Sequence, residues 1–508
     1  MAGTQTVHQI KTTLTLYRYL WLPFLVALLF RLLYAGLRIP DFWGDSYHNW
    51  YISWSILEHD WVYSDYKGRE LVWLPFYRYI VAGLMAVFKS NGLMLGHVFN
   101  ILVGSVTASY TAFFVQTFRG KTMGLIAGLI MAALPWHIAY SAMNLPNIFG
   151  GLLVLILVMQ AYKSNWALVV LLTAISVLTR YELTFILMMF GVFSLIRRDW
   201  KLSGSLLTGA LIGLGIWSWW SFHKTGDPLF WLTAKSAGLS WDALFQMQTY
   251  GQQRSWYFPI FSMIQSFPLL LFFLIPGSIK KQRKHWKLYT PILLAGAHWV
   301  FMLISQFQYF SQADPRYYII SLPLAVVGFS LIWNVEEFNT RWINRALSLF
   351  IVLVFVIQMF AFRYVSYTWT KFIQVGEYLE ELQPDGNLWI DEPSIIYYAD
   401  IDPARAFSSD QLAPSNSDYE MGVAHNLQAQ NIHYIVAFEA SYSKTLWIWP
   451  KMKNDEPITW NGFEFSLMYR SEPHQNTEQT KPGELRTWIE EIKGPVSVWK
   501  VEQQDQVK

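Results

Sequence analysis

Twelve long apolar windows constrain this chain more than any other feature of its sequence. Each approaches the roughly 20 residues that a helix needs to cross the hydrocarbon core of a bilayer. Of the 508 residues 53% are hydrophobic and 14% charged, against about 25% charged in soluble domains. We therefore predict a polytopic α-helical membrane protein with about 11–13 transmembrane helices. The windows cover residues 17–39, 71–88, 92–118, 122–141, 146–162, 166–180, 182–196, 203–222, 256–277, 288–306, 315–333 and 344–362.

Basic residues between these windows predict the orientation of the chain. Lys and Arg gather in loops 197–201 and 280–287, and such loops favour the cytoplasmic side. Loops 223–256 and 307–316 should then face outward, as should the residues that follow the last window. Counting from the N-terminus with an outer loop after the first window inverts this order. One early window is therefore expected to be re-entrant or to hide a second crossing.

The residues after about 368 have the composition of a soluble domain. An amphipathic helix is predicted over 370–383, where Pro384-Asp-Gly386 ends it. Four runs read as strands, namely 388–390, 432–438, 463–469 and 496–501. We predict a transmembrane domain over 1–365, with outer loops at 40–70 and 223–256, followed by a small extracytoplasmic α/β domain over 366–508.

Several kinds of chemistry are excluded or poorly supported. Cysteine is absent, so disulfides, thiolate metal sites and cysteine nucleophiles are excluded. A net charge of +3 without a basic arm implies no nucleic-acid partner, and nucleotide-binding fingerprints are missing. Asp41, Asp45 and His48 could hold a hard cation, but this spacing is weakly specific. We predict no obligatory metal or cofactor.

Asp45 is the leading candidate for a catalytic residue. It lies a few residues after the first apolar window, at the head of a stretch 47–58 whose aromatic and aliphatic residues recur at helical spacing. That spacing suits a helix lying flat in the membrane interface. A carboxylate beside an apolar wall can have its pKa raised by desolvation and act as a base. Capping of the helix N-terminus is the alternative.

Three arginines lie at the edges of apolar windows. Arg69 precedes a Trp-Leu-Pro-Phe-Tyr77 motif, Arg180 lies in Thr-Arg-Tyr-Glu182, and Arg316 lies in Asp-Pro-Arg-Tyr-Tyr318. An anionic lipid headgroup would be met by such side chains. Intramembrane charges also need partners whatever their role. Pairing of Arg180 with Glu182 and of Arg316 with Asp314, and an anchoring role for Arg69, therefore remain open.

Two further patterns are explained by structure without a functional role. Gly124-x-x-x-Gly128 and Gly209-x-x-x-Gly213 lie inside apolar windows, where small residues let helix backbones approach. We predict helix packing at both motifs. In the C-terminal domain, Asp391, Asp400 and Asp402 could touch a glycan, but solvated loop acids are the favoured interpretation.

Taken in order, these motifs resemble the GT-C superfamily of membrane glycosyltransferases. The resemblance rests on the early Asp45, the Trp-Leu-Pro-Phe-Tyr77 motif, a Leu-Pro-Trp-His-Ile-Ala-Tyr-Ser141 helix end and the two Arg-Tyr motifs. It is strongest for the branch related to protein O-mannosyltransferases (glycosyltransferase family 39) and to the aminoarabinose transferase of lipid A. It covers about 360 residues, the whole membrane region.

The resemblance implies an inverting transfer of a sugar from a polyprenyl-phosphate donor to a hydroxyl acceptor outside the membrane. Asp45 matches the family's base, and Arg180, Arg316 and Arg69 become candidates for binding the donor phosphate. We expect the sugar or acceptor to contact six further residues. The acceptor could be a lipid, a protein or a glycan, and the expected location is the inner membrane of a prokaryote. The six residues are His48, Asn144, Asn147, Tyr181, Glu182 and Tyr317.

The sequence departs from the family pattern at two places. Ser46 follows the expected base where many relatives have a second acid, and residues 143–147 carry amides where many relatives have an acid. Two rival functions remain: a transporter or flippase of lipid-linked glycans, and a non-catalytic glycan-binding membrane protein. The first rival is disfavoured because inverted repeats and paired broken helices are not evident in the sequence.

Overall fold

The computed structural model describes two units that are treated separately. The first unit comprises residues 1–39, 74–84 and 92–361, and the second comprises 40–73, 85–91 and 362–508. Within them the described residues are 2–37, 41, 44–63, 73–233, 257–270, 286–307, 315–333, 349, 353, 356, 370–412, 419–439, 443, 445–471 and 493–504. The early loop that carries Asp45 thus belongs to the same unit as the C-terminal residues.

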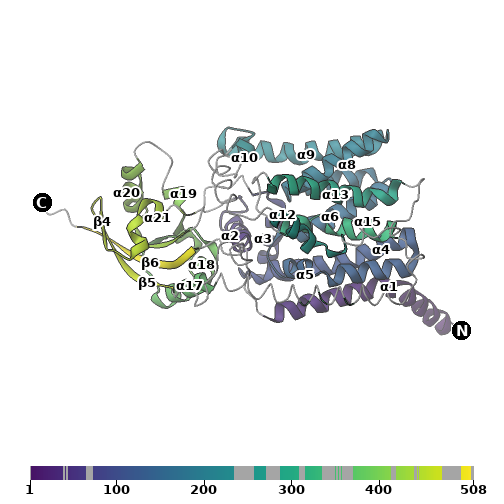
Figure 1. Ribbon diagram of the computed structural model, residues 1–508, viewed down its shortest axis with the longest axis horizontal. Coiled ribbons are helices and arrows are strands. Elements are labelled where there is room, and N and C mark those ends of the chain that lie inside the picture. Colours follow the sequence, from purple (N-terminus) through teal and green to yellow (C-terminus); the bar gives the residue numbers. More distant parts are fainter. Residues whose placement is uncertain are drawn as a thin grey trace. The chain divides into compact units, whose positions relative to one another are not determined.

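The first unit is a bundle of apolar helices, whose long members run alongside one another in Figure 1. Large aliphatic side chains on the outside of the bundle, such as Leu25 and Leu211, are exposed, as expected where lipid replaces water. The helices are α1 (Ala2–Gly36), α3 (Phe76–Phe88), α4 (Met94–Ala133), α5 (Pro135–Ser141), α6 (Pro146–Tyr162), α7 (Trp166–Val177), α8 (Tyr181–Ile196), α9 (Trp200–Thr225), α10 (Phe230–Thr233), α12 (Phe258–Ser266), α13 (Trp286–Phe307), α14 (Arg316–Ile319) and α15 (Leu322–Ile332).

Length and composition mark several of these helices as membrane spans. Among the described residues, four helices are long and apolar enough, and the bent pair α5–α6 would make a fifth. Four shorter apolar helices, α3, α7, α8 and α15, accompany them. The predicted class of polytopic helical membrane protein is therefore confirmed. Most of the expected window 344–362 lies outside the described residues.

Helix α4 is a hairpin of two helices. Its backbone leaves the helical region at Gly120, which has φ 81° and ψ 174°. A Cβ placed on Gly124 would lie 2.6 Å from the carbonyl oxygen of Ala112, although 12 residues of straight helix span about 18 Å. The chain therefore reverses at Gly120, and Gly128 lies close to Ala112 and to Pro23 of α1. The predicted packing role of this glycine pair is confirmed.

The second glycine pair also lies at a helix contact. A Cβ on Gly209 would lie 2.4 Å from the carbonyl oxygen of Val170, and one on Gly213 would lie 2.8 Å from that of Ala174. Helices α9 and α7 therefore approach each other along the glycine face, as small residues allow in membrane helices. Packing is confirmed as their role.

The expected crossing at 122–141 is wrong as a single helix. Helix α4 ends at Ala133, and α5 and α6 meet at 115° across a short break. Such a pair is a broken span or a re-entrant segment. The break follows from Pro135 and Pro146, each at a helix start, because proline cannot donate the backbone hydrogen bond that would continue a preceding helix. The irregular early segment expected from the basic loops stays a prediction.

The second unit contains helix α2 (Gly44–Glu58) and a six-stranded mixed sheet. The sheet has the order β2-β1-β3-β6-β5-β4, with β2, β1 and β3 parallel and the rest antiparallel. Its elements are α17 (Thr370–Leu382), β1 (Asn387–Trp389), α18 (Pro393–Tyr398), η4 (Pro403–Arg405), β2 (Ala406–Phe407), α19 (Ser409–Leu412), α20 (Tyr419–Ala429), β3 (Ile432–Glu439), α21 (Thr445–Ile448), η5 (Pro450–Asn454), β4 (Ile458–Trp460), β5 (Phe463–Arg470) and β6 (Lys493–Gln503).

Helices cover both faces of this sheet, with α17 on one side and α20 and α21 on the other (Figure 1). Phe372 of α17 packs edge-on against Phe438 of β3, with ring centroids 5.2 Å apart. On the opposite face Ile435 belongs to a core with Leu427 of α20 and Trp449. The alternation along β3 thus fills two layers. The predicted helix 370–383, the four predicted strands and the α/β class are confirmed, whereas the short strands β2 and β4 were not predicted.

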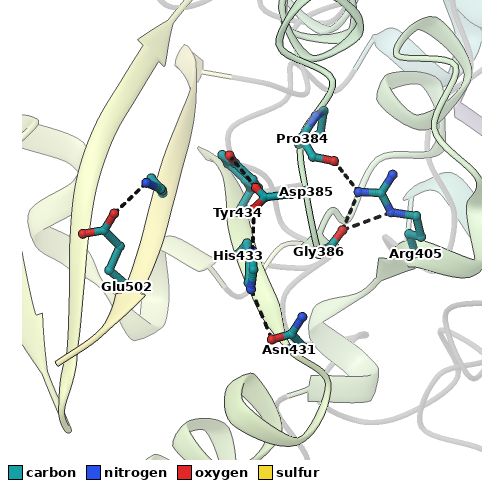
Figure 2. Close-up of polar contacts among 9 residues, drawn as sticks. Pro384, Asp385, Gly386, Arg405, Asn431, His433, Tyr434 and Glu502 are labelled. Carbon is teal, nitrogen blue, oxygen red and sulfur yellow. Dashed lines mark hydrogen bonds and ion pairs between the residues drawn. The ribbon is translucent and has the colours of Figure 1, made fainter. Parts of the chain in front are cut away.

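The turn after α17 is tied to the next loop of the domain. The Arg405 guanidinium donates to the carbonyl oxygen of Gly386 (Nε–O 3.0 Å) and also to that of Pro384, and Figure 2 shows both contacts. Gly386 has φ 72°, a region in which residues with a Cβ are strained. A Cβ there would also lie 2.5 Å from the His433 ring. Glycine is therefore required in the turn that follows this helix.

We expect Gly386→Ala to destabilise the second unit by about 1–2 kcal/mol, the cost of a left-handed backbone with a Cβ. Gly422→Ala is the matched control, because its Cβ would meet nothing within 4 Å in helix α20 and alanine favours a helix. The stability of each variant is measured as the midpoint temperature at which the purified full-length protein becomes susceptible to protease. Equal midpoints for the two variants would contradict the argument.

Candidate functional site

Arg180 and Glu182 form a buried ion pair at the start of α8. Arg180 Nε lies 3.0 Å from one Glu182 carboxylate oxygen, and its Nη2 lies 2.5 Å from the other. The exposed fractions of the two side chains are 14% and 13%. Arg180 has an extended backbone and precedes the helix, while Glu182 lies in its first turn. Pairing of Arg180 with Glu182, one of the two interpretations left open by the sequence, is thus confirmed.

Arg316 lies near this pair, at the first residue of the short helix α14. It is 9% exposed, and it interacts electrostatically with Arg180. Its Nη2 donates to the Tyr317 hydroxyl at 2.9 Å, and its guanidinium lies 4.9 Å from the centre of that ring. Two guanidinium groups and one carboxylate therefore share one polar cluster. Asp314, the predicted partner of Arg316, lies outside the described residues.

The backbone around Arg316 is held by polar side chains of other helices. Asn147 Nδ2 donates to the Arg316 carbonyl oxygen at 2.9 Å, and Ser266 Oγ donates to that of Pro315 at 3.4 Å. These bonds tie the backbone at the start of α14 to side chains of two other helices, and such pairing of polar groups matters most where lipid excludes water. The position of Arg316 therefore depends on the helices α6 and α12.

The break between α5 and α6 has its own network of polar groups. Asn100 Nδ2 donates to the carbonyl oxygens of Met143 (2.6 Å) and Leu145 (2.8 Å) and lies 2.9 Å from the Tyr77 hydroxyl. That hydroxyl donates to Asn144 Oδ1 at 2.8 Å. Asn144 and Asn147 are almost fully buried and bonded to the protein. Both amides therefore have a structural role here, and sugar binding by them stays a prediction.

Two further buried polar residues interact with members of this cluster, although neither lies in one of the sequence motifs. His298 is fully buried, interacts with Glu182, and has its Nδ1 2.8 Å from Ser321 Oγ. Arg78 of α3 is buried and interacts electrostatically with Tyr181. Both lie inside apolar runs, where an ionisable residue is a functional candidate by default. That rule would have identified them from the sequence.

Tyr181 and Tyr317 occupy different surroundings beside the arginines. Tyr181 is 38% exposed and stacks on Trp231 of α10, with centroids 5.8 Å apart. Tyr317 is half-buried against Arg316. Exposed or half-exposed rings suit stacking on a sugar face. Their predicted contact with a sugar, like that of Glu182, stays a prediction.

Asp45 lies in the second unit, in the first turn of α2. Its side chain is partly exposed, whereas the residues that follow it, Ser46, Tyr47 and His48, are buried. His48 packs against Trp73, with ring centroids 4.6 Å apart. The predicted flat interfacial helix is wrong in one respect, because side chains on both faces of α2 are buried. Arg69 lies outside the described residues.

The described residues do not bring three acidic, histidine or cysteine side chains into a metal-binding group. Asp41 instead accepts a short hydrogen bond from Ser46. In the C-terminal part, Asp400 and Asp402 are exposed as expected. Asp391 is not a solvated loop acid: it is 2% exposed and accepts hydrogen bonds from the Ser409 N–H (2.6 Å) and Ser443 Oγ (2.8 Å).

Comparison of this structure with solved structures finds similar folds, although no family model and no curated protein sequence matches the chain. ArnT from Cupriavidus metallidurans bound to undecaprenyl phosphate superposes with a TM-score of 0.56 and 12% identity, over 95% of this chain and 98% of that one. Its apo form gives 0.51 and 12% over 91% and 93%. The apo Archaeoglobus fulgidus oligosaccharyltransferase gives 0.45 and 11% over 83% and 70%.

The chain therefore has the GT-C fold, as its motifs predicted. The likeness to ArnT covers nearly the whole length of both chains. At 12% identity it establishes the fold.

We expect Glu182→Gln to destabilise the first unit by about 3–5 kcal/mol, because it leaves the Arg180 charge buried without its carboxylate. The double variant Arg180→Gln, Glu182→Gln should lose much less than the sum of the two single variants. Apparent unfolding midpoints in detergent give the comparison. Additive losses would show that the two side chains do not act as a pair.

Proposed function

We propose that this protein is an inverting glycosyltransferase. It moves a sugar from a polyprenyl-phosphate donor to a hydroxyl acceptor at the outer face of the membrane. The observation that carries the proposal is the buried cluster of Arg180, Glu182 and Arg316 in a helical unit with the GT-C fold. Two guanidinium groups with one carboxylate carry a net positive charge, which suits a phosphate at membrane depth.

The arginines would act on the leaving group. Guanidinium groups bind phosphate oxygens through short, charge-assisted hydrogen bonds. As the bond between the sugar C1 and the phosphate oxygen breaks, negative charge grows on that oxygen. Fixed positive charge stabilises the charge that develops in the transition state. Arg180 is held in place by Glu182, and Arg316 is held by its backbone.

Asp45 would act on the acceptor. The acceptor hydroxyl oxygen attacks C1 while its proton passes to the Asp45 carboxylate, and polyprenyl phosphate leaves. The configuration at C1 inverts because attack and departure occur on opposite sides. A partly exposed carboxylate on a helix with buried neighbours is accessible and yet fixed. Since the leaving group is already a phosphate, the reaction needs no obligatory metal.

The lipid and the cellular location are also proposals. The ArnT structure contains undecaprenyl phosphate, and we extend that class of lipid to the present chain. We place the reaction at the extracytoplasmic side of a prokaryotic inner membrane, with the C-terminal domain on the same side. This orientation is supported by the two basic loops 197–201 and 280–287. A transporter of lipid-linked glycans would use similar arginines but would have no use for a base.

Asp45→Asn keeps the shape of the side chain and removes the base, so we expect donor turnover to fall by about 100- to 10,000-fold. Release of sugar from synthetic polyprenyl-phosphate hexoses or pentoses by purified protein measures it, with and without a chelator. Equal turnover by wild type and variant would refute the assignment of Asp45. Donor binding without any consumption by wild type would favour the transporter.

Arg316→Gln should weaken binding of undecaprenyl phosphate by about 10- to 100-fold, the value of a hydrogen bond to a charged group. Arg119→Gln is the matched control, because the Arg119 guanidinium donates to the carbonyl oxygens of Leu331 (3.0 Å) and Trp333 (3.1 Å). Losing Arg119 should lower stability and leave lipid affinity unchanged. Unaltered affinity in Arg316→Gln would contradict the phosphate role.

A further inference from the structure

Helix α2 packs on helix α18 of the C-terminal domain through aromatic side chains. The Trp50 ring lies 5.2 Å from that of Tyr397, in an edge-on contact. The Tyr47 ring lies 5.7 Å from Tyr397 and 5.8 Å from Tyr398. All these residues belong to the second unit. The helix that carries Asp45 is therefore part of the folded C-terminal domain rather than an independent membrane-surface helix.

Hydrogen bonds of two tyrosine hydroxyl groups accompany this aromatic contact. The Tyr47 and Tyr398 hydroxyl oxygens lie 2.9 Å apart, and the Tyr51 hydroxyl donates to the Pro403 carbonyl oxygen at 3.4 Å. Burial raises the pKa of Tyr47 well above its ordinary value, with a smaller effect from Asp41. Burial likewise raises the pKa of Tyr398 to about 12. Both hydroxyls therefore stay protonated at neutral pH, and the bond between them persists.

The two residues after Asp45 are both fixed by side-chain bonds. Ser46 donates to the Asp41 carboxylate, and Tyr47 is bonded to Tyr398. Ser46 is fully buried and Tyr47 is 1% exposed, whereas Asp45 itself is partly exposed. Successive helical residues point about 100° apart. Fixing two of them therefore fixes the rotation of α2 about its axis, and with it the direction of Asp45.

Small rotations matter at this distance from the helix axis. A carboxylate about 5 Å from the axis moves by about 1 Å when the helix turns by about 10°. A displacement of about 1 Å in a reacting group can cost about 100-fold in rate. The orientation of α2 should therefore affect a base at Asp45 strongly, while leaving lipid binding by the arginines of the first unit unchanged.

We propose that Tyr398 is a positioning residue, through which the C-terminal domain sets the orientation of Asp45 by way of Tyr47. This inference rests on the proposed transferase function. It gives the C-terminal domain a part in the reaction, although Tyr398 touches neither donor nor acceptor. The covering of α2 by α18 and the pair of hydroxyls are the observations that carry it.

Tyr398→Phe removes one hydroxyl and keeps the ring, so it breaks the hydrogen bond to Tyr47 without leaving a large cavity. We expect kcat to fall about three- to tenfold, the effect of one neutral hydrogen bond, with KM for the donor unchanged. Tyr47→Phe should give the same loss, and the double variant should lose no more than either single variant, because the two hydroxyls form one bond. Hydrogen–deuterium exchange should rise in the first turns of α2.

Tyr434→Phe is the matched control in the same unit, because its hydroxyl bonds to Asp385 at 3.2 Å beside the sheet (Figure 2). It should leave both kcat and exchange in α2 unchanged. An active wild type with unaltered kcat in Tyr398→Phe, or with additive losses in the double variant, would overturn this inference alone. A wild type that binds donor and never consumes it would instead overturn the proposed transferase function, and the positioning role with it.

Discussion

The first unit depends on satisfying backbone groups where a helix breaks inside an apolar bundle. Without water, each carbonyl or N–H group left by the break between α5 and α6 would cost several kcal/mol. Asn100 supplies the donors for the carbonyl oxygens of Met143 and Leu145, and the chain of bonds continues through Tyr77 to Asn144. One amide of α4 thus permits the 115° bend, and the bend in turn presents Asn147 at the start of α6.

The same constraint explains how charged groups can be held beside that bend. Asn147 bonds to the backbone of Arg316, whose guanidinium contacts Tyr317. Glu182 reduces the repulsion between Arg180 and Arg316, which would otherwise be severe in a medium of low dielectric constant. The phosphate of the proposed donor would bring negative charge to these two guanidinium groups.

Much of the fold and part of the site could be predicted from the sequence. Long apolar runs predicted the class of helical membrane protein. The Pro384-Asp-Gly386 turn predicted where α17 ends. The Thr-Arg-Tyr-Glu182 motif placed its two partners two residues apart, and they can pair because the backbone of Arg180 is extended. The break between α4 and α5 at Leu134 was harder to predict, because residues 122–141 look as apolar as a single span. Strands β2 and β4 have two and three residues, too few for a period to be recognised, and they exist only because neighbouring strands pair with them.

Two further errors share one cause, which is long-range burial of polar residues. The spacing of aromatic residues in 47–58 predicted an interfacial helix, which would have one wet face, yet the polar residues Asn49 and Ser53 are buried. Asp391 predicted a solvated loop, yet it accepts hydrogen bonds from residues 18 and 52 positions away in the sequence. Loops that follow parallel strands meet at one edge of a sheet, so the loops after β1, β2 and β3 converge on this carboxylate. A single sequence shows which residues are polar but not which distant segments cover them. Where one helix is covered by another element, as α2 is by α18 through Tyr47 and Trp50, the covering element becomes a candidate for controlling the chemistry of that helix.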